Sequence, residues 1–312
     1  MTKIDWPDGK RFAFTVFDDT DHTTLQNSPA IYRFLYDAGI ITTKSVWPIN
    51  YGSAPEVKGA TCQNPAYLEW VRKLKEQGFE IALHNASYRT LKREQIASGL
   101  EQFKRYFGEY PKAQANHGFC GDSLYWGDAR LSGANRLLYN LMTGFKNRGK
   151  FQGHVESSEL FWGDLCKRHI KYVRNFVYPG INTLKACPYM PYFDEKRPFV
   201  NYWFASSEGG YCRAFCKTIS EENQDRLEEE GGACIMYTHF SFPDFYQDGR
   251  LNPEFTRLVE RLRRKSGWFV PVSRLLDHIL EKRGPYTISN RERARLERRW
   301  LAKKLFVVGG SS

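Results

Sequence analysis

Four residues that can do chemistry follow one another at the end of an apolar segment, "FAFTVFDDTDHTT" (residues 12–24). Three of them are the carboxylates Asp18, Asp19 and Asp21, and the fourth is His22. Adjacent carboxylates repel each other, so such a pair usually serves a bound cation or a reaction. Aspartate and threonine also occupy ordinary turns and helix caps, which is the simpler interpretation of the same residues.

Histidines and polar neighbours close three more strand-like segments. His84 and Asn85 end "FEIALHN", Asn116 and His117 end "KAQANHG", and Thr238 and His239 end "CIMYTHF". A single histidine at a strand end is more often a buried or capping residue than a ligand. Three of them, together with an aspartate pair, indicate one shared site, because carboxylate and imidazole groups bind divalent metals and transfer protons.

The intervening segments alternate between strand and helix patterns. Strand patterns cover residues 11–19, 40–49, 79–85, 112–118, 174–182, 200–207, 233–240 and 268–272. Helix patterns cover residues 28–38, 66–77, 91–107, 131–145, 159–173, 220–231, 252–266 and 273–282. Repeated strand–helix units predict an α/β fold with a mainly parallel sheet, either a barrel or an open doubly wound sheet. In a barrel the carboxyl ends of the strands meet at one rim, where active sites lie.

Composition narrows the class of protein. The chain has 312 residues, 41% of them hydrophobic, and its seven cysteines have no regular spacing, which predicts reduced thiols and a cytoplasmic location. No run of about 18 apolar residues occurs. The net charge of +11 is concentrated in residues 281–304, where nine Lys or Arg face three Glu, a local charge of +6. A basic surface confined to one segment argues against a nucleic-acid partner for the whole fold.

The motifs resemble those of the polysaccharide deacetylases, the NodB or carbohydrate esterase four group. "FTVFDDTD" resembles the family's first motif, and "QGFEIALHNASYR" resembles the second, which leads into a metal-binding histidine, here His84. "ANHG" stands in the place of the third motif and "CIMYTHF" resembles the fifth. The resemblance spans residues 12–280 and implies a NodB-like distorted (β/α) barrel of about seven strands. The pattern also resembles deacetylase-like proteins of lipopolysaccharide and O-antigen synthesis.

The resemblance also implies roles for particular residues. Asp19 would bind a divalent metal, most simply zinc, with His84 and His117, and His22 would be the reserve ligand. Asp18 would act as general base and His239 as general acid. The family's second metal-binding histidine is replaced by Tyr88. Residues expected to contact substrate are Asn85, Tyr88, Arg89 and Asn116, and Arg89 or Arg174 would orient the base.

These roles together imply a metal-dependent N-deacetylase of an acylated amino sugar, working in the cytoplasm on surface polysaccharide precursors that could be lipid-linked. Three alternatives remain open at this point. Allantoinase-like relatives hydrolyse amides without a metal, and the missing second histidine favours that reading. The barrel could also be an inactive sugar-binding protein. A nucleic-acid binder rests on the basic segment alone.

The last segment is expected to be a unit separate from a barrel of residues 1–282. Residues 283–312 include "SNRERARLERRWLAKKLFVV", in which Leu296, Trp300, Leu301 and Leu305 fall near one helical face. The remaining faces are strongly basic, so the segment predicts a basic amphipathic helix. Its apolar stripe would pack on the barrel, or it would bind the anionic inner face of a membrane.

Overall fold

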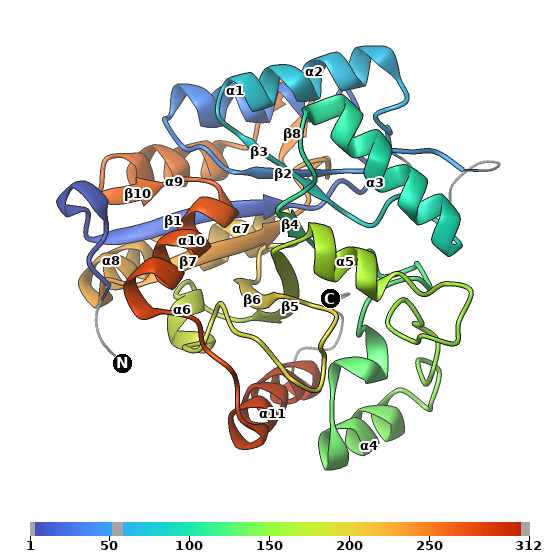
Figure 1. The fold of residues 1–312 in the computed structure, drawn as a ribbon. Coiled ribbons are helices and arrows are strands. Elements are labelled where there is room, and N and C mark those ends of the chain that lie inside the picture. Colours follow the sequence, from blue (N-terminus) through green and yellow to red (C-terminus); the bar gives the residue numbers. More distant parts are fainter. Residues whose placement is uncertain (1–3, 52–58, 307–312) are drawn as a thin grey trace.

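Within residues 4–51 and 59–306, the part of the chain that this computed structural model describes, seven parallel strands close into a ring (Figure 1). In ring order the strands are β1 Phe12–Asp18, β2 Thr43–Val46, β3 Glu80–Leu83, β4 Ala113–Gln114, β5 Tyr172–Tyr178, β6 Tyr202–Ser207 and β7 Ala233–Thr238. Strand β1 pairs with both β2 and β7, which closes the barrel. A further strand, β10 Gly267–Phe269, pairs with β1. The predicted (β/α) barrel is therefore confirmed.

Helices cover the outside of the ring between the strands (Figure 1). They are α1 Pro29–Asp37, α2 Pro65–Glu76, α3 Arg93–Phe107, α4 Gly133–Met142, α5 Gly163–His169, α6 Thr183–Ala186, α7 Cys212–Thr218, α8 Glu221–Glu230, α9 Pro253–Arg263, α10 Val272–Arg283 and α11 Asn290–Phe306. The 3-10 helices η1 Pro7–Gly9 and η2 Gly127–Arg130 and the hairpin of β8 Tyr246–Gln247 and β9 Arg250–Leu251 complete the elements.

Most predicted elements are present, with different lengths. Helix α8 begins after the predicted cap Ser220, whose side chain accepts a hydrogen bond from the backbone of Asn223, and ends at Gly231 with φ of 63°. The helix predicted over residues 159–173 is shorter, because its last residues turn extended and enter β5, which pairs with β4 and β6. Sequence patterns missed α6 and α7, which are only one to two turns long.

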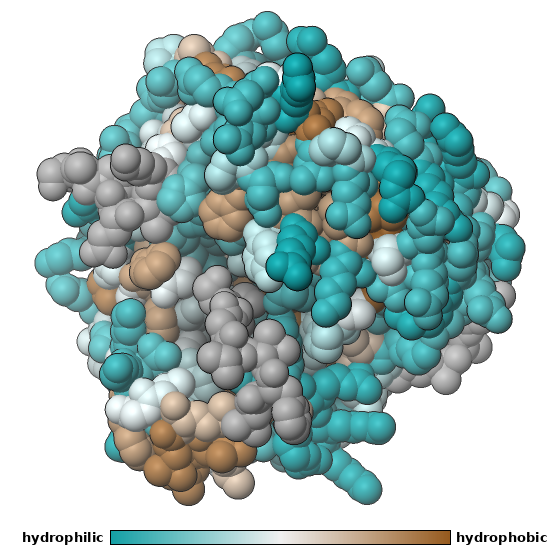
Figure 2. Space-filling view, turned by 180° about the vertical axis from the view of Figure 1, so that it is seen from behind, coloured by the Kyte–Doolittle hydropathy of each residue, from teal (hydrophilic) through white to brown (hydrophobic). Residues whose placement is uncertain are grey.

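The face of the molecule that Figure 2 shows is mainly hydrophilic. Figure 2 shows a hydrophobic patch, brown at the lower left, on the part of the molecule where Figure 1 places α4. In the part of the chain that the structure describes, no helix is both long enough and apolar enough to cross a bilayer.

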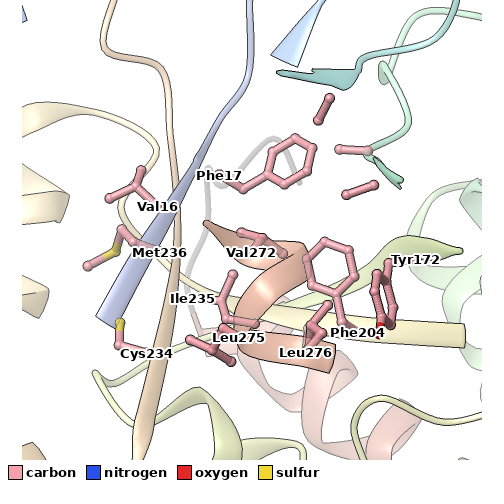
Figure 3. Packing of buried hydrophobic residues seen from close by; sticks show 14 of the residues in the cluster. Val16, Phe17, Tyr172, Phe204, Cys234, Ile235, Met236, Val272, Leu275 and Leu276 are labelled. Carbon is pink, nitrogen blue, oxygen red and sulfur yellow. The ribbon is translucent and has the colours of Figure 1, made fainter. Parts of the chain in front are cut away.

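The core lies on both sides of the strands. All seven residues of β1 are buried, and Figure 3 shows Val16 and Phe17 leaving neighbouring positions in opposite directions. Val16 lies beside Met236 of β7, whereas the ring of Phe17 lies 6.0 Å from that of Phe204 on β6. This alternation is the normal geometry of a strand, and it decides which side each residue at the end of β1 faces.

Helix α11 is part of this core. Its residues Leu296, Trp300 and Leu301 are buried in the same hydrophobic cluster as the barrel strands. The Trp300 ring lies 5.7 Å from that of Phe176 on β5. The boundary predicted between residues 282 and 283 therefore does not separate two hydrophobic cores, and this stripe is not available to a membrane. Residues 307–312 and the side chain of Leu305 lie outside the described residues.

Buried polar contacts fix α11 in the same place. Arg293 donates two hydrogen bonds, both 2.8 Å long, to the carboxylate of Asp194. The Glu297 carboxylate is fully buried and accepts hydrogen bonds from Ser132 and from Asn135 of α4. Buried charges need such partners, and two basic residues of the segment, Arg293 and Lys303, form ion pairs with Asp194 and Glu208 instead of facing solvent.

Candidate active site

The register of the barrel brings the predicted residues together. Asp18 of β1 lies opposite Thr238 of β7, so the residues that follow, Asp19 and His239, emerge side by side. Leu83 of β3 lies opposite Gln114 of β4, which places His84 next to the segment that carries Asn116 and His117. All of these positions are at the carboxyl ends of parallel strands, the rim where barrel enzymes place their chemistry.

The carboxylate of Asp21 is the centre of the cluster. Its Oδ1 lies 2.8 Å from Nε2 of His117, and its Oδ2 lies 3.1 Å from Nε2 of His84 and 3.2 Å from Nε2 of His239. Burial alone would raise the pKa of Asp21, but the charge and hydrogen bonds of the three histidines outweigh it and hold the pKa well below its usual range. Asp21 is therefore an ionised, buried carboxylate.

The second nitrogen of each histidine is also engaged. Nδ1 of His84 lies 3.1 Å from the carbonyl oxygen of Ala115, and Nδ1 of His239 lies 2.9 Å from that of Gly210. Nδ1 of His117 lies 3.3 Å from the Cys120 sulfur. A carbonyl accepts only, so in His84 and His239 Nδ1 carries the proton, and Nε2 is the atom presented to Asp21. Such second-nitrogen contacts are the usual way in which a metal-binding histidine is oriented.

This donor set fits a divalent cation. The ligand atoms of Asp21, His84 and His117 all lie within 4.8 Å of one another, and so do those of Asp19, Asp21 and His239. A neutral imidazole with Nδ1 protonated has no second proton for a carboxylate, so the contacts to Asp21 require either imidazolium ions or a cation between the groups. One carboxylate and two imidazoles are a common set for zinc and for other first-row metals.

Asp19 has a different partner from the one predicted. Arg174 of β5 donates two parallel hydrogen bonds to its carboxylate, from Nη1 to Oδ1 at 2.9 Å and from Nη2 to Oδ2 at 2.5 Å. The nearest approach of Asp19 to Nε2 of His84 is 3.9 Å. The guanidinium also stacks over Tyr237 at 4.6 Å, which fixes its plane. Of the two candidates for orienting a base, the structure brings Arg174 to the site, and Arg89 does not line the cavity.

Asp18 does not reach the site, contrary to the prediction that it acts as general base. Its carboxylate is fully buried and accepts a 2.7 Å hydrogen bond from the Tyr32 hydroxyl and a 2.8 Å bond from the backbone N–H of Phe240. Nζ of Lys44, also fully buried, lies 3.0 Å from it. The reason is the alternation of β1: neighbouring residues face opposite sides, so only one member of the Asp18–Asp19 pair can face the cavity.

The cluster opens into a cavity of about 330 Å³. It is lined by Asp19, Asp21, His22, His84, Asn116, His117, Gly118, Phe119, Trp126, Arg174, Tyr237, His239 and Phe242. Polar groups that converge at the base of an aromatic pocket are the usual form of a small-molecule site. Phe119 is 60% exposed at the mouth, so an aromatic surface extends outward from the reactive groups.

The predicted substrate-contacting residues divide into two groups. Asn116 lines the cavity, where it is held by paired hydrogen bonds with the backbone of Leu124. Asn85 and Tyr88 do not line it. Asn85 accepts a 2.9 Å hydrogen bond from the backbone N–H of His117 and so positions that residue, and the Tyr88 hydroxyl donates to Asn50.

His22 and Asp21 lie at places that the sequence motif did not suggest. His22, the reserve ligand, is exposed and has a left-handed backbone with φ of 59°. Its ring lies 5.6 Å from that of Phe242 at the cavity wall, outside the cluster around Asp21. Sequence reasoning did not assign a role to Asp21, although it stands in the same motif, because the family pattern drew attention to the adjacent pair Asp18–Asp19.

Solved structures of other proteins share this fold. A candidate polysaccharide deacetylase from Mycobacterium smegmatis matches with a TM-score of 0.52 and 14% identity, over 93% of this chain and 98% of that one. The fold is that of the polysaccharide deacetylases. An allantoinase, Puue, has a TM-score of 0.49 with 12% identity over 89% and 93% of the two chains. A candidate polysaccharide deacetylase from Pseudomonas aeruginosa PAO1 has a TM-score of 0.48 with 10% identity over 89% and 94%. No family model matches the sequence, and no curated protein matches it.

Proposed function

We propose that the chain is a metal-dependent amide hydrolase that removes the acyl group from an acylated amino sugar. The observation that supports this proposal is that two buried aspartates, 2 residues apart, have different partners. Asp21 contacts His84 and His117. Asp19 instead accepts hydrogen bonds from Arg174. Amide hydrolysis by this route needs a metal site beside a separate, ionised base, and one aspartate serves each purpose.

Asp21, His84 and His117 would hold the metal ion. When bound, a divalent cation lowers the pKa of a coordinated water and polarises a carbonyl oxygen. His117 replaces the family's second histidine, whose place in the motif is taken by Tyr88. The replacement works because β3 and β4 are adjacent, so the end of β4 can supply an imidazole to the point that the second motif otherwise fills.

Asp19 would accept the proton of the attacking water. Its bidentate contact with Arg174 fixes the orientation of the carboxylate. The water oxygen then forms the new bond to the acyl carbon while the carbon–nitrogen bond breaks. The products are a carboxylate and the free amino sugar.

His239 would give the departing nitrogen its proton. Burial lowers the pKa of His239, but its hydrogen bond to Asp21 and the charges of Asp21 and Asp19 outweigh burial and raise it to about 9. These carboxylates favour the charged imidazole, which is the form that a general acid needs. Its Nδ1 contact with Gly210 turns Nε2 toward the cavity.

The walls of the cavity support a sugar as the substrate. Trp126, Phe119, Tyr237 and Phe242 surround the reactive groups with aromatic faces, on which the apolar faces of sugar rings stack. The cavity is at the small end of the ~300–1,000 Å³ range of ligand pockets, so it fits one acylated sugar with the rest of a longer substrate outside. The setting we propose is the synthesis of surface polysaccharide such as O-antigen, in the cytoplasm, on lipid-linked precursors.

A second candidate is an amide hydrolase that works without a metal. Two observations favour it: Tyr88 stands where the family has a metal ligand, and each histidine contact to Asp21 has the length of a complete hydrogen bond. In that enzyme imidazolium groups would polarise the carbonyl in place of the cation.

Metal analysis combined with an activity assay separates these candidates. Protein purified without chelator is analysed for zinc, iron, cobalt and nickel, and is then assayed on a panel of N-acetylated and N-formylated amino sugars before and after chelation. Acetate or formate release that chelation abolishes and one metal restores supports the first candidate. Full activity without metal supports the second, and no release of acyl group from any sugar tested contradicts both.

A further inference from the structure

An exposed apolar surface lies on α4 and the turn that follows it, away from the catalytic residues. Its members are large side chains that are 37–60% exposed: Leu137, Leu138, Leu141, Met142 and Phe145. The four residues on the helix recur at helical spacing, so they share one face of α4, and Phe145 lies on the turn that follows. We name these five residues the α4 patch. Contiguous exposed apolar residues on a soluble fold mark a binding surface more often than isolated ones do.

The patch is held outward by the opposite face of the helix. On that face the Tyr139 ring packs 5.8 Å from Trp300 of α11, and Asn135 donates a hydrogen bond to Glu297. Arg136, beside the patch, forms an ion pair of 2.7 Å with Asp128 of η2. After α4 the chain turns through Gly144 and Phe145, whose φ angles are 56° and 61°. These contacts fix the helix, so the α4 patch cannot turn into the core.

The charged side chains that directly follow the patch along the chain are all basic. Residues 129–155 contain no Asp or Glu, and the exposed Lys146, Arg148 and Lys150 follow the patch directly. An apolar helical face bordered by cations is the pattern of a helix that lies in the interface of an anionic bilayer, with its apolar side chains among the acyl chains and its cations at the headgroups.

We propose that the α4 patch binds the surface of an anionic membrane. A second copy of this chain fits less well, because two patches meeting face to face would bring their basic borders together, and like charges across an interface are unfavourable. The anionic bilayer satisfies both the apolar face and the cations. This surface replaces α11 as the membrane-binding element, since the apolar stripe of α11 is buried.

Vesicle flotation with the full chain tests the proposal. The probes are vesicles of phosphatidylcholine alone and of phosphatidylcholine with about one quarter phosphatidylglycerol. We expect binding to the anionic vesicles to exceed binding to the neutral ones at least tenfold, and to fall steeply at about 0.5 M salt because screening weakens the headgroup contacts.

Two double variants and one control variant test whether the α4 patch is the binding surface. The Leu138→Gln, Leu141→Gln double variant and the Arg148→Glu, Lys150→Glu double variant should each lose at least tenfold in binding, with unchanged melting temperature, because all four side chains are exposed. The matched charge control is Arg213→Glu with Lys217→Glu on α7, also exposed, which should retain binding.

Three results would overturn the proposal. They are failure of the full chain to bind anionic vesicles, binding that both α4 variants leave unchanged, and a dimer in sedimentation that Leu138→Gln with Leu141→Gln dissociates. None of these readouts depends on catalytic activity, so the proposal can fail while the proposed hydrolase stands.

Discussion

Arg174 of β5 binds both carboxylate oxygens of Asp19 in a buried, bidentate ion pair, with N–O distances of 2.9 and 2.5 Å. Both groups are at most 3% exposed, so little water competes for their contacts. The pair therefore holds the Asp19 carboxylate in one orientation at the edge of the histidine cluster.

Asp19→Asn should lower kcat by about 10²–10⁴-fold while the metal content stays the same. The substitution removes the positioned base but removes none of the proposed metal ligands. Arg174→Lys should also lower kcat, since a single ammonium cannot hold both oxygens in the plane of the guanidinium fork. Steady-state kinetics with metal analysis of each variant checks this. Loss of metal together with activity in Asp19→Asn would make Asp19 a ligand instead.

Asp21→Asn and His117→Ala should each remove most of the bound metal, because both contribute an atom to a group of potential ligands that all lie within 4.8 Å of one another. His22→Ala is the matched control, since His22 lines the same cavity but is exposed and lies outside that group. Inductively coupled plasma measurements on the three variants, with circular dichroism to confirm folding, decide the ligand set. Equal metal loss in the His22 variant would show that the assignment is incomplete.

Asp18→Asn should lower the free energy of unfolding. Removing one partner of a buried ion pair costs about 3–5 kcal/mol, because Lys44 would keep an uncompensated charge in the core. Adding Lys44→Met to Asp18→Asn should recover part of the lost unfolding free energy, which a double-mutant cycle in urea measures. A folded, fully stable Asp18→Asn enzyme that has lost its activity would restore the catalytic assignment that the structure disfavours.

His154 should make the protein less stable in mild acid. Burial and the nearby charges of Arg197 and Arg136 lower its pKa to about 4, and its Nδ1 accepts a hydrogen bond from the backbone N–H of Tyr125. Because the folded pKa is depressed below the unfolded value of about 6.5, the neutral form stabilises the fold above pH 6.5. That contribution, about 2 kcal/mol, is lost as the pH falls from 6.5 to 4.

His154→Asn provides the check, because its amide oxygen can accept the same hydrogen bond without titrating. The unfolding free energy of the variant should change less between pH 6.5 and 4 than that of the parent protein. An identical pH dependence in both proteins would assign the acid sensitivity to other groups.

Trp300→Ala should lower the free energy of unfolding by about 3–5 kcal/mol, because the ring is 1% exposed and packs against Phe176 and Tyr139. Arg298→Ala, two residues away and exposed, should change it by less than about 0.5 kcal/mol. Thermal and urea unfolding of both variants compare the buried and exposed faces of α11. Equal stability of the two variants would mean that α11 does not contribute to the core.

The sequence pattern by itself predicted a mainly parallel α/β sheet and a shared site at the strand ends, whereas the closed barrel followed only from the family resemblance. Alternating strand and helix patterns predict parallel strands, because these patterns depend only on local periodicity. Polar residues at four strand ends predict one shared site, because parallel strands have their carboxyl ends at the same rim. His84, His117 and His239 were found for this reason, and all three contact Asp21.

Only the tertiary structure decided which aspartate faces the cavity. Asp18 and Asp19 are chemically identical neighbours, and the side of β1 that faces the cavity is set by pairing with β2 and β7, which are distant in sequence. Asp21 lies beyond the strand, where the period of two no longer holds, so its direction depends on the turn that ends at His22.

For the amphipathic helices α4 and α11 too, only the tertiary structure decided which apolar face is buried. A helical stripe of apolar residues shows that one face seeks a nonpolar partner, but it does not identify that partner. Packing against β5 and α4 buries the stripe of α11, whereas the apolar face of α4 stays exposed because its polar side is tied to Glu297 and Asp128. Which stripe remains free depends on long-range contacts, and those form only when the whole chain has folded.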